Sequence, residues 1–349
     1  MKRLAFAVPG NLATPTGGYA YDRQIIAELR RIGWSIDVID LGGGFPRADA
    51  KMRMAAQTLL AKTPEGCPIV IDGLAFGELP EAAAALHARN PLVALVHHPL
   101  AFESGLSRAD AETFRASERS ALAHARRVIV TSAATAQLLT TGYGVPAERI
   151  TVARPGSTPV MPAHGSGDGI VRLLAVGSLV PRKGYDVLIA ALATIDDLPW
   201  RLTIAGDAER DPATAARIGS QIAHAGLTER ISLAGAVPPE RLAEFYAAAD
   251  VFVLASRFEG YGMAYAEAIA YGLPVIGTTA GAIPDMLSGD AAILVAPEDA
   301  SALTHALRRL IANKDERQRF AAAARAAAGR LPKWRDSAAL FAGAIEAAI

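Results

Sequence analysis

Short apolar runs alternate with alanine-, leucine- and arginine-rich segments along almost the whole chain. Uninterrupted apolar runs are typical of strands buried on both faces, and the longer segments between them have the composition of helices. Strands that alternate with helices predict parallel sheets covered by helices on both sides, an α/β fold. The expected strands lie at residues 4–8, 35–39, 69–71, 93–96, 128–130, 150–152, 171–176, 200–205, 231–234, 249–254, 273–276 and 292–295.

The length of the chain and one loop-like segment predict two domains. A chain of 349 residues exceeds what one hydrophobic core usually supports. Residues 161–169 are rich in glycine and proline and lack apolar periodicity, so we place the linker there. We expect two Rossmann-like, doubly wound domains, 1–162 and 170–334, facing each other across a cleft formed by the carboxyl ends of both sheets.

The charge balance and the single cysteine exclude several classes of protein. Lysine plus arginine equals aspartate plus glutamate at 35 each, which argues against a dedicated nucleic-acid-binding protein. Cys67 alone cannot form an intrachain disulfide or a multi-cysteine metal site. The apolar start of the chain is broken by Pro9 and Gly10, too early for a signal peptide, and no long uncharged apolar run follows. We expect a cytoplasmic protein, for which peripheral attachment to the inner membrane face stays open.

Two glutamates eight residues apart, Glu259 and Glu267, follow the apolar run 251–255. Eight helical steps would leave two side chains about 80° out of line, so we expect Glu259 in a glycine-bracketed loop and Glu267 in the helix after it. Such a loop suits an anion, because free backbone N–H groups and the helix dipole point out of it. Carboxylates would repel a phosphate, so they must accept hydrogen bonds from hydroxyl groups attached to the anion. The stretch therefore suggests a nucleotide-sugar site.

A basic loop follows the first expected strand of the second domain. Arg182 and Lys183 can neutralise a diphosphate there, arginine through forked hydrogen bonds and lysine as a point charge. The alternative is a solvated basic loop, but the flanking Gly177 and Gly184 and the position after a strand favour phosphate. We expect the two basic residues to lie across the cleft from the glutamates. In another loop on the same rim, Val237 could contact a base.

Two loops of the first domain also follow strands. Gly17 and Gly18 precede a helix and would let backbone amides approach a phosphate, although they could also form an ordinary turn. They do not complete the G-x-G-x-x-G fingerprint, which weakens the case for a nicotinamide cofactor. His97 and His98 follow the strand 93–96, where a histidine either donates to a sugar hydroxyl or is a structural group. Two histidines are too few for a closed metal site. Neighbouring side chains of an extended segment point in opposite directions, so we expect only one of the two, His97 by preference, to face a ligand.

The chain resembles the retaining glycosyltransferases of family 4, whose GT-B architecture consists of two Rossmann-like domains. The resemblance covers nearly the whole length. The motifs that carry it are the Gly17–Gly18 loop, His97, the segment with Gly177, Arg182, Lys183 and Gly184, the Gly206–Asp207 turn, the Glu-x7-Glu pair, the run Glu259, Gly260, Tyr261, Gly262, Met263, and Trp334. The stretch Gly281-Ala-Ile-Pro-Asp285 departs from the family's Gly-Gly-Ile-Pro-Glu, so we leave it outside the expected site.

The resemblance implies a role for each charged residue of the expected site. Arg182 and Lys183 would bind the donor diphosphate and stabilise the leaving group, so no metal or other cofactor is expected. Glu267 would hold the ribose hydroxyls. Glu259, with the backbone that follows it, would hold the donor sugar, and His97 would touch the hydroxyls of that sugar.

The resemblance also implies the reaction and which substrate each domain binds. A hexose-type sugar would pass from a UDP- or GDP-sugar to a glycan, lipid-linked or small-molecule acceptor, with retention at the anomeric carbon and attack on the same face. Domain 1–162 would hold the acceptor, with Gly17 and Gly18 leaving space for it and for the phosphates. Domain 170–334 would bind the donor, and a closing helix at 335–349 would cross back to the first domain.

Other functions remain alternatives to sugar transfer. One is a nucleotide-sugar epimerase of the same architecture, and another is a two-domain protein that binds a nucleotide sugar without chemistry. An NAD-dependent dehydrogenase would also contain Rossmann-like domains, but the chain lacks the glycine fingerprint with its following acidic residue.

Overall fold

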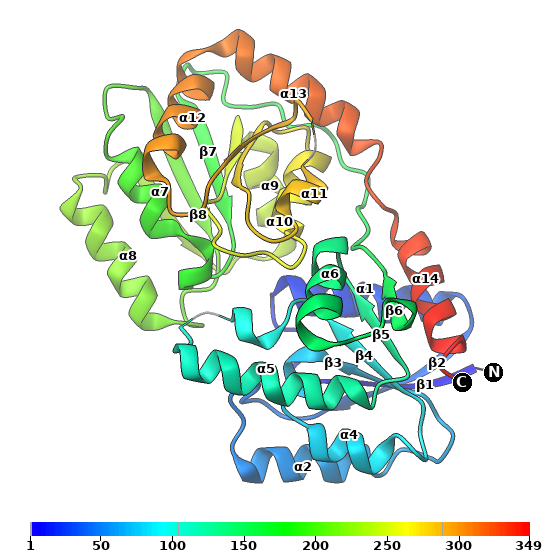
Figure 1. Cartoon of the computed structure of the whole chain (residues 1–349). Helices are drawn as coiled ribbons and strands as arrows, with labels where there is room; N and C mark the ends of the chain where they lie inside the picture. Colours follow the sequence, from blue (N-terminus) through cyan, green and yellow to red (C-terminus); the bar gives the residue numbers. More distant parts are fainter. Residues whose placement is uncertain (1, 104, 288) are drawn as a thin grey trace. The chain divides into compact units, whose positions relative to one another are not determined.

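The computed structural model describes residues 2–103, 105–287 and 289–349, which form two compact units (Figure 1). The first unit takes in the residues up to Gly156 together with Pro332–Ile349, and the second comprises Ser157–Leu331. Each unit has its own parallel sheet and its own hydrophobic core. No helix within the described ranges is long and apolar enough to cross a membrane.

The first unit is an α/β unit with one sheet of six strands in its described residues. The strands are β1 Lys2–Val8, β2 Trp34–Asp40, β3 Ile69–Asp72, β4 Leu92–Val96, β5 Arg127–Val130 and β6 Ile150–Val152. The helices are α1 Gly17–Arg31, α2 Ala50–Leu60, α3 Gly73–Phe76, α4 Pro80–Leu86, η1 Leu100–Phe102, α5 Arg108–Ala123, α6 Ala133–Tyr143, η2 Ala147–Arg149 and α14 Trp334–Glu346.

The strand order of this sheet marks where a ligand would bind. The order is β2-β1-β3-β4-β5-β6, and every neighbouring pair is parallel. The chain leaves β1 in one direction to β2 and continues from β3 in the other, so the topological switch point lies between β1 and β3. Open α/β sheets bind ligands in the crevice outside the carboxyl ends of the strands at such a point.

The second unit repeats the α/β plan, again with six strands among the described residues. The strands are β7 Val171–Val176, β8 Trp200–Ala205, β9 Ile231–Gly235, β10 Val251–Val253, β11 Val275–Thr278 and β12 Ala292–Val295. The helices are η3 Pro181–Lys183, α7 Tyr185–Leu192, α8 Pro212–His224, α9 Pro239–Ala248, α10 Met263–Ala270, α11 Ile283–Met286, α12 Ala300–Ala312 and α13 Lys314–Ala328.

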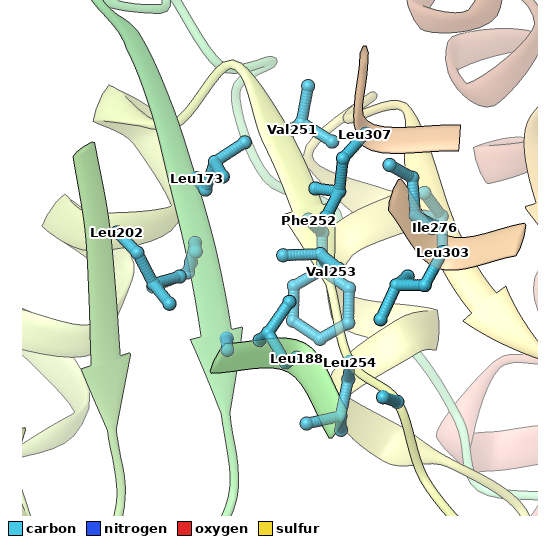
Figure 2. Packing of buried hydrophobic residues seen from close by; sticks show 14 of the residues in the cluster. Leu173, Leu188, Leu202, Val251, Phe252, Val253, Leu254, Ile276, Leu303 and Leu307 are labelled. Atoms are coloured by element: carbon cyan, nitrogen blue, oxygen red, sulfur yellow. The ribbon is translucent and has the colours of Figure 1, made fainter. Parts of the chain in front are cut away.

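The second sheet has the strand order β12-β11-β10-β7-β8-β9, all parallel, with its switch point between β7 and β10. Its core surrounds the middle strand β10, where Phe252 is fully buried (Figure 2). Figure 2 shows Leu303 of α12 near Ile276 of β11, and both belong to the same buried cluster as Leu307 and Phe252. Helix and sheet are therefore joined by continuous apolar packing, which fixes the loops at the strand ends.

The boundary between the units falls earlier than the expected linker at 161–169. Three backbone N–H groups of that stretch donate to the second unit: Ala163 to the carbonyl of Tyr271 at 2.8 Å, His164 to that of Ala247 at 2.9 Å, and Ser166 to the carboxylate of Asp250 at 3.2 Å. A glycine- and proline-rich segment lacks apolar periodicity, but its N–H groups can still bind a neighbouring surface. The stretch is thus part of the second unit.

The last helix, α14, belongs to the first unit, and the return begins at Pro332 (Figure 1). Helix α14 contacts α1, β5 and β6. The ring of Phe341 stacks on Phe6 of β1 with centroids 6.2 Å apart, and the ring of Trp334 lies 5.8 Å from that of Tyr21. Trp334 therefore anchors the start of the helix in the first unit, although we expected residues up to 334 in the second domain.

The α/β fold of two doubly wound parallel sheets is confirmed, and each expected strand is present. The central strands are buried on both faces and need apolar runs, and the edge strands β2, β6, β9 and β12 still carry short ones. We expected Gly17 and Gly18 to precede a helix, but the structure includes both in it. Helix α1 begins at Gly17 because the hydroxyl of Thr16 accepts from the N–H of Tyr19.

Candidate active site

The basic loop of the second unit follows β7 and contains the turn η3, which holds Arg182 and Lys183. Gly184 ends this turn with φ 65°, a left-handed conformation that favours glycine. A Cβ atom at Gly184 would lie 1.9 Å from the carbonyl oxygen of Ala255, just after β10. Glycine therefore lets the basic loop lie directly against the end of β10, at the switch point of the sheet.

Glu259 lies in direct contact with both basic residues. Lys183 Nζ donates to Glu259 Oε1 at 2.7 Å, and Arg182 Nη1 donates to Glu259 Oε2 at 3.2 Å and to the carbonyl of Phe258 at 2.9 Å. The hydroxyl of Ser256 also donates to Glu259 Oε1 at 2.7 Å. The side chains of Arg182, Lys183 and Glu259 are only 18%, 14% and 7% exposed. The structure thus brings together three charges that we expected on opposite sides of a cleft.

Burial and charge act against each other in this group. Burial would raise the pKa of Glu259, but Lys183 and Arg182 outweigh it and lower that pKa to about 2. Burial lowers the pKa of Lys183, while Glu259 opposes that effect. Glu259 is consequently an anion at neutral pH, with both oxygens accepting hydrogen bonds.

Arg257 fixes the basic loop to the loop that carries Glu259. Its backbone N–H donates to the carbonyl of Arg182 at 2.7 Å, and its guanidinium donates to the carbonyl of Pro181. The same guanidinium forms a forked pair with Asp186 at 2.7 and 2.9 Å and binds Glu298. Forked arginine pairs fix geometry as well as charge. Arg257 therefore positions Arg182 and Lys183 from outside the site.

Glu267 occupies a separate environment on α10. Its Oε2 accepts from the hydroxyl of Tyr246, on α9, at 2.8 Å. Burial raises the pKa of Glu267, and the hydrogen bond from Tyr246 opposes this only in part. The two glutamates therefore differ in charge environment, as expected if they bind different parts of a ligand.

The remaining residues of the expected donor site lie in loops of the second unit or, for Met263, at the first position of α10. Gly177 follows β7, Val237 lies half-buried between β9 and α9, and Gly260, Tyr261, Gly262 and Met263 lead into α10. A Cβ atom at Gly281, where φ is 56°, would lie 2.2 Å from the carbonyl oxygen of Glu259. The N–H of Ala282 donates to that oxygen at 2.9 Å. The stretch we had left outside the site thus supports the backbone of Glu259.

In the first unit, Gly17 and Gly18 form the first turn of α1 beside His97. A Cβ atom at Gly18 would lie 3.4 Å from the imidazole of His97. His97 Nε2 lies 3.2 Å from Asp22 Oδ1 and 3.4 Å from Asp72 Oδ2. Asp22 comes from α1 and Asp72 from the end of β3, so this group lies at the switch point between β1 and β3.

The protonation of this group is set by two opposing effects. Burial would lower the pKa of His97, but the two carboxylates raise it to about 10. Burial raises the pKa of Asp22 to about 7, against the pull of His97. Asp22, His97 and Asp72 are also the one set of side chains, within the ranges the structure describes, whose spacing would suit a metal ion. Nε2 lies at hydrogen-bonding distance from a carboxylate, so we interpret the set as hydrogen-bonded.

His98 has a different partner, as expected for alternating side chains. Its Nε2 lies 2.6 Å from Glu103 Oε1. Of the two histidines, His97 is therefore the one beside Gly18 and the switch point.

Several residues of these groups were missed by the sequence reasoning. Asp22 lies three, four and seven residues before Ile25, Ile26 and Leu29, which are buried on α1. A carboxylate on the apolar stripe of a helix is unusual, and this pattern could have identified Asp22 from the sequence. Asp72 ends an otherwise apolar strand, a similar signal. Nothing in the local sequence distinguishes Ser256, Arg257 or Tyr246.

Comparison with known families agrees with this fold. The family described as Glycosyl transferases group 1 matches residues 161–327, and the family described as Glycosyltransferase Family 4 matches residues 74–157. The two matches do not overlap and together cover most of the chain. The chain belongs to the family 4 glycosyltransferases.

Curated relatives match over part of their length. A D-inositol 3-phosphate glycosyltransferase of Xylanimonas cellulosilytica is 34% identical over 56% of this chain and 51% of the relative. An MMP alpha-(1->4)-mannosyltransferase of Mycolicibacterium hassiacum is 28% identical over 74% of this chain and 66% of the relative. The matches thus span about half to two thirds of the relatives' own length.

Solved structures match over nearly the whole chain. Sucrose-phosphate synthase from Thermosynechococcus elongatus has a TM-score of 0.81 at 23% identity, covering 98% of each chain. Anabaena HepE in complex with UDP and glucose has a TM-score of 0.77 at 19% identity, covering 99% of each chain. At these identities the likeness concerns the fold, which is that of the GT-B glycosyltransferases.

Proposed function

We propose that the protein transfers a hexose-type sugar from a UDP- or GDP-sugar to a glycan, lipid-linked or small-molecule acceptor, with retention at the anomeric carbon and without a metal ion. The observation that carries the proposal is the buried group of Arg182, Lys183 and Glu259 at the switch point between β7 and β10. A neutral sugar would need no such pair of cations, whereas a diphosphate does.

The basic pair would act on the leaving group. As the bond between sugar and diphosphate breaks, negative charge develops on the diphosphate. Arg182 and Lys183 are already held in place by Arg257 and Glu259, so they would stabilise this charge with little reorganisation. The positive charge that a metal ion would otherwise supply comes from these two side chains.

Glu259 is poorly suited to be a nucleophile or a general base. Its pKa of about 2 makes it a weak base, and its oxygens already accept hydrogen bonds from Lys183, Arg182 and Ser256. This supports a reaction in which the acceptor attacks on the face that the diphosphate leaves. Glu259 would then orient the donor sugar together with the basic pair, and Glu267 would hold the ribose.

The relatives support sugar transfer as the reaction class. Their names include a mannosyltransferase and a glycosyltransferase acting with D-inositol 3-phosphate, and HepE was solved with UDP and glucose. The first substrates to test are therefore UDP-glucose and GDP-mannose, each with phosphorylated and unphosphorylated sugar acceptors.

The test is a transfer assay with product analysis by proton NMR. We expect a product with the anomeric configuration of the donor, formed equally well in EDTA. Arg182→Ala and Lys183→Ala should each lower kcat about 10²–10³-fold, the usual effect of losing one group that stabilises transition-state charge. Arg308→Ala is the matched control, because Arg308 also pairs with a carboxylate, that of Asp197, but on the surface of the same unit.

Three results would overturn the proposal. If neither substitution affects transfer, the basic pair does not stabilise the leaving group. A product with inverted anomeric configuration would contradict same-face attack. Conversion of the donor in the absence of any acceptor would identify an epimerase instead.

A further inference from the structure

The contact between His97 and two aspartates restricts the protonation of the ring. His97 Nε2 faces Asp22 Oδ1 at 3.2 Å and Asp72 Oδ2 at 3.4 Å. An unprotonated Nε2 is an acceptor and would be repelled by two carboxylate oxygens, so Nε2 carries a hydrogen while both aspartates are ionised. Two carboxylates at this distance also favour the charged form of the whole ring.

The other groups packed against His97 do not compete for its charge. The Tyr21 ring meets the imidazole edge-on with centroids 5.3 Å apart, and the Tyr21 hydroxyl donates to the carbonyl of Ala153 at 2.9 Å. The hydroxyl of Thr131 donates to the backbone carbonyl of His97 at 3.2 Å. Among the residues that the structure describes, Asp22, Asp72 and Tyr21 are the titratable groups found against the ring.

The second ring nitrogen, Nδ1, is not used by the contacts with the two aspartates. Nδ1 has no hydrogen-bond partner among the residues the structure describes, and 17% of the His97 side chain is exposed. A protonated ring presents Nδ1–H as a donor and has no acceptor to offer.

The net charge of the group indicates which ligand oxygen it suits. Asp22 is completely buried and Asp72 almost so, and one oxygen of Asp22 has no partner. One imidazolium beside two carboxylates has a net charge of zero or below, depending on whether Asp22 is protonated. Such a group does not attract phosphate, but the Nδ1–H that it leaves without a partner among the described residues can bind a hydroxyl or ring oxygen.

We propose that Asp22 and Asp72 are positioning residues that hold His97 as an imidazolium, so that its Nδ1–H donates to an uncharged oxygen of the bound sugar. The inference rests on the proposed sugar transfer for its ligand. His97 is then a permanent donor that cannot act as a general base at neutral pH.

The protonation state is measured without any activity. Ring ¹⁵N shifts of the labelled full-length protein, assigned with His97→Gln, should show both nitrogens of His97 protonated from about pH 6 to about pH 9, whereas an ordinary histidine titrates near about 6.5. A His97 that loses a proton near neutrality would overturn the inference even if the protein transfers sugar. A His97 signal that a chelator restores would overturn it too, because the three side chains would then hold a metal.

The role of the aspartates is tested with Asp72→Asn. The amide retains an oxygen for the N–H of Leu74, which Asp72 Oδ1 accepts at 2.8 Å, so the start of α3 is kept. We expect the pKa of His97 to fall by about 1–3 units. Transfer by the variant should then decrease as pH rises, while the wild type stays level. Asp37→Asn is the control, because Asp37 is an exposed carboxylate paired with Arg3.

A double variant separates positioning from a structural role. If Asp72 acts through His97, then Asp72→Asn should cost no further transfer activity in the His97→Gln protein. Additive losses, or a loss that does not depend on pH, would assign Asp72 a structural role and overturn the inference. If no donor supports transfer while His97 remains doubly protonated, the proposed function fails and the protonation result stands.

Discussion

Lys183 Nζ lies 2.7 Å from Glu259 Oε1, and both side chains are more than four-fifths buried. The two residues are 76 positions apart and come from the loops after β7 and β10, which the switch point brings together. The cationic site is therefore built around an internal anion. Any diphosphate that binds must share the lysine and arginine with Glu259.

Loss of one partner from this pair should be costly to stability. Lys183→Met leaves Glu259 with Arg182 and Ser256 alone, and we expect the free energy of unfolding to fall by about 2 kcal/mol, the usual cost of a buried group that loses a partner. Urea unfolding of the wild type and the variant measures this. Arg308→Ala, which breaks an exposed pair with Asp197, should cost below about 1 kcal/mol. Equal costs for the two variants would contradict the buried pair.

Acid should weaken the fold through Glu259. Its pKa is lowered from 4.5 to about 2 in the folded protein. The stabilisation is complete above the unfolded value and is lost as pH falls through the folded one. The difference in unfolding free energy between wild type and Glu259→Gln should therefore shrink between about pH 5 and about pH 2. A difference that stays constant over this range would show that Glu259 is not held as an anion.

The close approach of the two loops can be tested with glycine substitutions. Gly184→Ala places a Cβ atom 1.9 Å from the carbonyl of Ala255, so the basic loop must move. We expect it to cost about 2 kcal/mol or more in stability and to reduce sugar transfer. Gly226→Ala has a similar φ of 69° but nothing within 4 Å of its Cβ, and should cost only about 1 kcal/mol with no effect on transfer. Similar behaviour of the two variants would argue against the close approach.

The separate surroundings of Glu267 predict a separate role. If it holds the ribose, Glu267→Gln should weaken the binding of UDP or GDP by about tenfold, and the binding of the matching nucleotide sugar by the same factor. Isothermal titration calorimetry gives both affinities. A loss confined to the nucleotide sugar would place Glu267 at the sugar instead.

Most of the fold was predictable because buried parallel strands require apolar runs, and these are visible in the sequence. The location of Arg182, Lys183 and Glu259 in loops after strands of one sheet was predictable too. Their contact was not, because it depends on loops that approach through Gly184 and Gly281. The linker was expected at 161–169, but this stretch binds the second unit. It does so through backbone hydrogen bonds, which cannot be recognised from an apolar pattern in the sequence.

The group around His97 shows a different limit of the sequence. His97 was selected because it follows a strand, but its two carboxylates are contributed by α1 and β3. Asp22 lies on the buried stripe of its helix, which could have been noticed. Its pairing with His97 depends on the strand order β1-β3-β4, and no local pattern encodes that order.

The most direct test of the central claim is the melting temperature of the protein in a panel of nucleotide sugars. A ligand that binds only the folded state stabilises it by about 2.7 kcal/mol at a concentration of about 100 times its Kd. We predict that at least one UDP- or GDP-sugar raises the melting temperature of the wild type and of Arg308→Ala, and that the double variant Arg182→Ala, Lys183→Ala loses the effect. If no nucleotide sugar shifts the wild type, or if the double variant is stabilised as much as the wild type, the basic pair is not a diphosphate site and the account is contradicted.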